Sequence, residues 1–131
     1  MSSEPAQKLT LTFPGERRFI GMARMFVGGL AARVDLGYET MDDMQLALES
    51  VLQKAELGSE VTLEAQLEGQ GVTLFAGPFV GDPLESSVGH AGELELERLL
   101  SALVAGAEST RRDDGCWLRL DVRIPASSGS T

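Results

Sequence analysis

The stretch Thr40–Leu57, TMDDMQLALESVLQKAEL, has the strongest structural signal in the chain. Its apolar residues recur every three or four positions, which predicts an amphipathic helix with one stripe against a core. Thr40 followed by Asp43 resembles a capping box, so we expect the helix to begin at Thr40. Gly58 suits its C-terminal end. The predicted core stripe consists of Met41, Met44, Leu48, Val51, Leu52 and Ala55.

The polar side of this helix carries Glu49 and Gln53, a carboxylate and an amide one turn apart. Such pairs are common on exposed helix faces, where they interact with each other or with water. If the pair lines a pocket, it indicates a nucleotide-handling domain or a descendant of one. If it does not, the sequence describes a small α/β binding module.

Length and charge narrow the classes of function. The 131 residues suffice for one domain with one core. A formal charge of −9 repels phosphate backbones and anionic membranes, so we expect a protein partner and no nucleic acid. There is no long apolar run, and the start MSSEPAQK lacks the basic and apolar regions of a signal peptide. With Cys116 as the lone cysteine, we expect a cytoplasmic protein without disulfides, and His90 has no partner at metal-ligand spacing.

Alternation of apolar and polar residues predicts the strands, and three-to-four spacing predicts two further helices. The fold class we predict is α/β, as an α+β two-layer sandwich: a mixed, mostly antiparallel sheet of about four to five strands with three helices on one face. We expect strands at 7–13, 60–67, 72–76, 107–111 and 116–124, helices at 16–36, 40–57 and 93–105, and a long loop at 77–92.

We expect a single domain over residues 7–124, with disordered ends at 1–6 and 125–131. Two surfaces are candidates for contact with a second chain. The first helix contains Gly21, Gly28 and Gly29, which indicate close approach of another backbone, either within the domain or from a partner. The open sheet face should carry Trp117 among charged residues.

The order of elements over residues 7–124 resembles the GHKL ATPase fold, and within it the anti-sigma factor serine kinases of bacteria. The best match is MDDMQLALESVLQKA, which looks like the helix where those kinases carry a Glu followed four residues later by an Asn. The resemblance assigns Glu49 the role of the base that activates the attacking hydroxyl. It assigns Gln53 the place of the Asn that holds magnesium, with a side chain longer by one methylene.

The other two motifs of the family are altered in this chain. Where the family has Asp-x-Gly-x-Gly, with the Asp bound to adenine, the chain has Gly77-Pro78-Phe79-Val80-Gly81 and keeps only Gly81. Where the family has a phosphate-binding Gly-x-Gly, the chain has His90-Ala91-Gly92 and keeps Gly92, followed by an acidic helix start. The resemblance therefore implies a degenerate ATP site at Gln53, Gly81 and Gly92.

With these altered motifs, the resemblance implies an anti-sigma-factor-like regulatory module that binds a sigma factor or a STAS-domain protein and has lost ATP binding and kinase activity. No cofactor is expected on this interpretation, and homodimerisation is a further hypothesis. The alternative is an active ATP-dependent serine/threonine kinase that phosphorylates a STAS-domain antagonist. It would use Glu49 as the base and Gln53 on magnesium.

Overall fold

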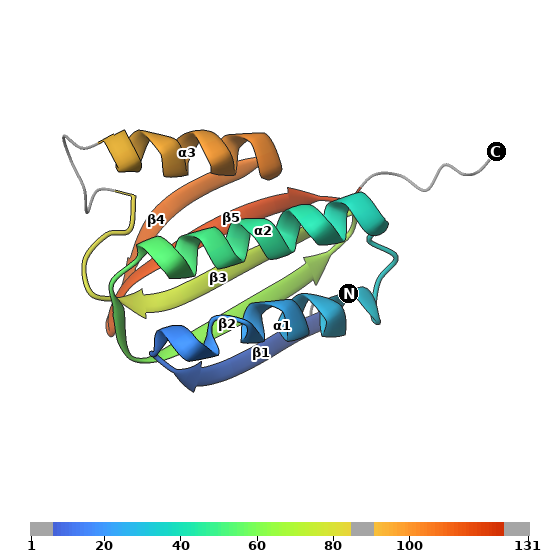
Figure 1. The fold of residues 1–131 in the computed structure, drawn as a ribbon. Helices are drawn as coiled ribbons and strands as arrows, with labels where there is room; N and C mark the ends of the chain where they lie inside the picture. Colours follow the sequence, from blue (N-terminus) through green and yellow to red (C-terminus); the bar gives the residue numbers. More distant parts are fainter. Residues whose placement is uncertain (1–6, 85–90, 125–131) are drawn as a thin grey trace.

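Five strands form one antiparallel sheet, and three helices cover one of its faces (Figure 1). The computed structural model describes residues 7–84 and 91–124. The sheet order is β1-β2-β3-β5-β4, and all of its neighbouring pairs are antiparallel. The predicted two-layer α+β fold is confirmed. The elements are β1 (Gln7–Pro14), a 3₁₀ turn η1 (Arg17–Phe19), α1 (Met22–Ala31), α2 (Tyr38–Lys54), β2 (Leu57–Glu68), β3 (Gly71–Phe79), α3 (Ala91–Leu103), β4 (Gly106–Arg112) and β5 (Gly115–Arg123).

Alternation along the strands places most of their apolar residues on the face beneath the helices. The register brings Leu63 opposite Leu11 on one side and Ala76 on the other, and it pairs Leu74 with Leu120. These residues join the helix side chains in one core. The other face of the sheet is open and carries the polar residues of each strand (Figure 1).

Helix α2 lies between α1 and α3 in the helix layer (Figure 1). Its predicted stripe is confirmed, since Met44, Leu48, Val51 and Leu52 are buried, together with Ala47. A buried stripe along more than two turns determines how the helix is rotated on the sheet. Its remaining residues must therefore face α1, α3 or solvent.

Both predicted ends of this helix need correction. The helix begins at Tyr38, with Gly37 as the N-cap at a φ of 80°, and no side chain caps it. Thr40 therefore lies inside the first turn, and the predicted capping box is wrong. At the other end Gly58 belongs to β2, because the strand already pairs at Leu57 with Phe79.

The first helix is shorter than predicted. Residues 16–36 divide into η1 and α1, with Gly21 at the N-cap of α1 and no side chain supplying a cap bond. Glycine at this junction weakens a continuous helix, which is one physical reason for the break. After Ala31 the chain turns back toward α2, and this turn buries Leu36 in the core.

The predicted loop at 77–92 begins later, because β3 continues to Phe79. The predicted disordered ends, residues 1–6 and 125–131, lie outside the described residues, as does His90. Within the described part of the chain, none of the helices is long and apolar enough to cross a membrane.

Two leucines on α2 test the assigned rotation of this helix. Leu48 is 1% exposed and Leu46 is 45% exposed. We expect Leu48→Ala to lower the free energy of unfolding by about 3 kcal/mol through lost burial and a cavity. Leu46→Ala is the matched control and should change it by less than about 0.5 kcal/mol. Urea denaturation followed by circular dichroism measures both, and equal losses would contradict the rotation.

Candidate functional site

Glu49, the predicted catalytic base, is bound to a cation from the neighbouring helix. Its Oε2 lies 2.8 Å from Nε of Arg24 on α1, and its Oε1 accepts a longer bond of 3.4 Å from Nη2. Gln45 also contacts Arg24 through its side chain. The Glu49 side chain is 17% exposed. Glu49 therefore lies on the side of α2 that packs against α1, and α3 packs against the opposite side of α2.

Gln53, the predicted magnesium ligand, lies in the last turn of α2 with an exposed side chain. Its backbone carbonyl accepts a hydrogen bond of 3.1 Å from Nη1 of Arg17. With Ile20 and Lys54 these residues line a shallow surface hollow. The hollow carries two cations and no carboxylate, so its chemistry suits an anion better than a metal ion.

Gly81 follows β3 with a φ of 87°, a backbone conformation that favours glycine. The next residue, Asp82, accepts hydrogen bonds at Oδ1 from the backbone N–H of Leu84 and from the hydroxyl of Ser109 on β4. Gly81 and Asp82 line a cavity with Ser109 and Cys116, among others. This cavity is separate from the hollow at Gln53.

Gly92, the predicted phosphate-binding glycine, lies in the first turn of α3. The C-terminal end of α2, the end of β3 and the start of α3 gather at one end of the molecule (Figure 1). The fold thus brings the backbone positions of Gln53, Gly81 and Gly92 to the same end. It does not bring Glu49 with them, since that side chain is turned toward α1.

The position that the family resemblance assigns to the adenine-binding Asp is Gly77, and it has no room for a side chain. A Cβ at Gly77 would lie 2.8 Å from Cγ and Cδ2 of Trp117 and 2.9 Å from the carbonyl oxygen of Cys116. Gly77 shares the open face of the sheet with Phe75, two residues earlier, whereas the helices cover the other face. The described residues therefore do not fit this part of a GHKL nucleotide site.

Trp117 forms the centre of a cluster on the open sheet face that the sequence did not reveal. The Arg112 guanidinium carbon lies 3.9 Å from the centroid of the Trp117 ring and 4.8 Å from that of Phe75. Arg112 also forms an ion pair of 3.4 Å with Glu64. The indole Nε1 donates a hydrogen bond of 2.8 Å to Asp114.

This cluster covers Trp117, which is only 3% exposed. Trp117 lies on the open face as predicted, yet its ring offers little surface to a second chain. The contact between Arg112 and Trp117 follows from the pairing of β4 with β5 through a short turn. In this register Arg112 lies diagonally across from Trp117 on the same face of the sheet. Predicting this contact from the sequence would have required the strand register, which the alternation of apolar and polar residues alone does not supply.

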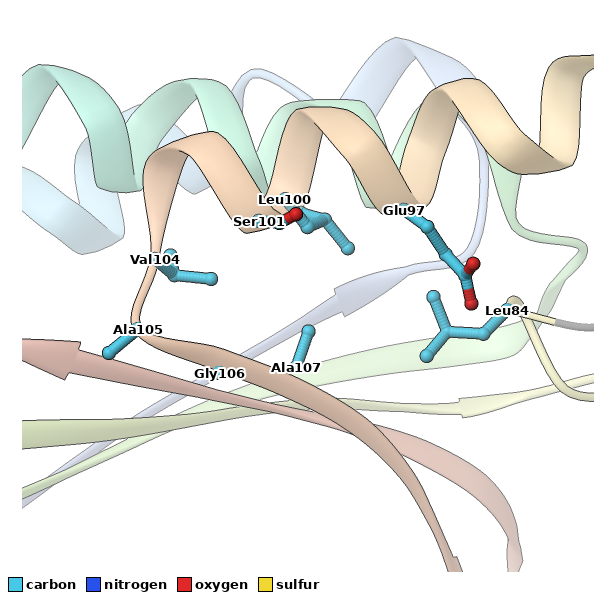
Figure 2. Close-up of a pocket in the computed structure, with 8 residues that line it drawn as sticks. All are labelled: Leu84, Glu97, Leu100, Ser101, Val104, Ala105, Gly106 and Ala107. Atoms are coloured by element: carbon cyan, nitrogen blue, oxygen red, sulfur yellow. The ribbon is translucent and has the colours of Figure 1, made fainter.

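A cavity of about 310 Å³ lies between α3 and β4 (Figure 2). Leu100 of α3 and Val104, just after the helix, line it from above, and Gly106 and Ala107 line it from β4. The Glu97 carboxylate lies beside Leu84 at one end, as Figure 2 shows. Small residues on β4 leave this space under α3.

No protein-family model matches the chain, and a search of curated proteins finds no significant match. Within the described residues, no cluster of three or more His, Cys, Asp or Glu side chains could hold a metal ion. The resemblance to anti-sigma factor kinases therefore stays a prediction based on the order of elements and the motifs.

The contact between Gly77 and Trp117 can be tested by adding one methyl group. We expect Gly77→Ala to lower the free energy of unfolding by about 1–3 kcal/mol, because the new Cβ overlaps the indole and a backbone carbonyl. Gly28→Ala in α1 is the matched control, since a Cβ there meets nothing within 4 Å. It should stabilise the helix by about 0.5–1 kcal/mol. Thermal or urea unfolding distinguishes the two, and a neutral Gly77→Ala would show that the ring has room to move.

Proposed function

We propose that this protein is a regulatory binding module of the anti-sigma type, which acts by contact with a sigma factor or a STAS-domain protein rather than by phosphorylation. The proposal rests on the order of elements and on the altered motifs. The observation that carries it is the packing of Trp117 against Gly77. A residue able to read adenine cannot occupy that position without moving the indole.

The surroundings of Glu49 also support the proposal. A general base must reach the hydroxyl proton that it abstracts and must be free to accept it. Here both carboxylate oxygens are engaged by Arg24, which competes with any substrate hydroxyl for them. Glu49 is therefore better suited to holding α1 against α2 than to catalysis.

One observation favours the alternative, an ATP-dependent serine/threonine kinase. The hollow beside Gln53 carries Arg17 and Lys54, two cations that could contact a phosphate group. On that alternative Arg24 would release Glu49 when substrate binds, and Gln53 would approach magnesium. The same alternative predicts that Glu49→Ala abolishes phosphate transfer to a STAS-domain protein.

Calorimetric titration with MgATP separates the two proposals. We expect no saturable heat, because Gly77 has no room for the side chain that would bind adenine and the acidic protein repels the triphosphate. A titration with magnesium and a non-hydrolysable ATP analogue is the control, because slow hydrolysis of ATP would itself release heat. A dissociation constant in the low micromolar range would contradict the binding-module proposal and support the kinase.

The partner can be tested directly with purified proteins. We expect one sigma factor or STAS-domain protein of the same genome to bind this chain without any nucleotide, as measured by biolayer interferometry. Addition of MgATP should leave the affinity unchanged. Binding that requires nucleotide, or failure of every such protein to bind, would contradict the proposal. A cytoplasmic location, where a thiol such as Cys116 stays reduced, is part of the same proposal.

A further inference from the structure

Helix α3 extends past the β4 edge of the sheet, and the cavity of about 310 Å³ lies beneath its outer side (Figure 2). We propose that this edge is a docking site for an extended segment of a partner protein. The segment pairs with β4 as an additional strand and places one apolar side chain in the cavity. The site is independent of the proposed function, because any protein with a segment of the right chemistry can occupy it.

The spacing of helices and strands explains why α3 overhangs the sheet. Packed helices lie about 8–10 Å apart, whereas paired strands lie about 4.8 Å apart. Three helices therefore cover about six strand positions, and the sheet has five strands. Helix α1 packs over β1 and β2, and α3, at the other side of α2, lies over β4 (Figure 1). The side of α3 that faces away from α2 thus has no described strand beneath it.

The cavity opens on this outer side of α3. Leu100 is buried toward the sheet, whereas Glu97 and Ser101, which also line the cavity, are exposed. Figure 2 looks onto this side, with α2 behind α3. Gly106 and Ala107 of β4 form the lower wall, and their small size leaves the space open toward the edge. A side chain from a strand beside β4 would therefore enter between Ala107 and Leu100.

The outer edge of β4 has backbone groups available for pairing. Strand β4 is last in the sheet order, and β5 is its neighbour on the inner side. When an extended peptide adds to such an edge, backbone hydrogen bonds supply affinity and pockets for alternate side chains supply specificity. Charged side chains on an edge strand hinder indiscriminate pairing. Those of β4 project above and below the sheet, so they select the sequence of the partner and leave the backbone edge accessible.

Two charged residues of β4 define the chemistry of this partner. Arg111 shares the helix-covered face with Ala107, four residues earlier. It is exposed and forms no ion pair with the other described residues. Glu108, on the open face, has a 66% exposed side chain and reaches Arg119 only at 4.0 Å. The partner segment should therefore carry an acidic residue opposite Arg111, a basic residue opposite Glu108 and an apolar residue opposite Ala107.

Titration of the full-length, ¹⁵N-labelled chain with a synthetic peptide tests the proposal by NMR. Antiparallel pairing, as in the rest of the sheet, gives the peptide sequence Thr-Glu-Thr-Thr-Lys-Val-Thr. We expect saturable shifts of backbone amides in β4 and around the cavity, with a dissociation constant below about 1 mM. A peptide with Asp in place of Val should bind at least about tenfold more weakly, because it would bring a charge into the cavity. Absence of saturable shifts, or shifts centred elsewhere, would overturn the proposal.

A charge exchange tests the register of the added strand. Arg111→Glu should weaken binding of the peptide by about threefold to tenfold, because an attraction becomes a repulsion. A peptide with Lys in place of its Glu should restore the affinity of this variant. Arg18→Glu in η1 makes the same change in net charge far from β4 and should leave the affinity unchanged. If Arg111→Glu weakened both peptides equally, the proposed register would be wrong.

Discussion

The packing of α2 across the middle of the sheet is the constraint on which the other features depend. Leu48, Val51 and Leu52 are buried against the strands, and this burial determines the rotation of the helix. Once the helix is so rotated, Glu49 must face α1, where Arg24 meets it. The direction of the candidate catalytic carboxylate is thus a consequence of hydrophobic packing on the opposite side of the same helix. An ion pair at a partly exposed site contributes about 1 kcal/mol or less, far less than the buried stripe.

The strands and the central helix could be predicted from sequence because their signal is local and repeated. Period-two alternation of burial is kept along β1 and through most of β2 and β3, since these strands have one face on the core and one face open. The ends of the helices could not be predicted equally well. Thr40 is a good N-cap residue in isolation, but the helix already begins at Tyr38. Gly58 belongs to β2 rather than to the end of the helix, because strand pairing starts at Leu57. Capping preferences amount to about 1 kcal/mol, so tertiary pairing can override them.

The candidate site was less predictable than the fold because its decisive contacts join distant residues. Arg24 and Glu49 are 25 positions apart and belong to different helices. Trp117 and Gly77 meet only because β3 pairs with β5 in a particular register, with an irregularity after Ala76. The motif alignment correctly drew attention to Gly77 as the residue in place of an Asp. It could not show that the indole of Trp117, from another strand, occupies the space that a side chain at position 77 would need.

The open sheet face and the β1 edge differ in how their apolar side chains are covered. On the open face, Arg112 lies over both aromatic rings, and Glu64 balances its charge. A cation stacked on rings stabilises the cluster while presenting polar atoms to water. At the β1 edge no comparable cover exists among the described residues, and Met25 is left in solvent.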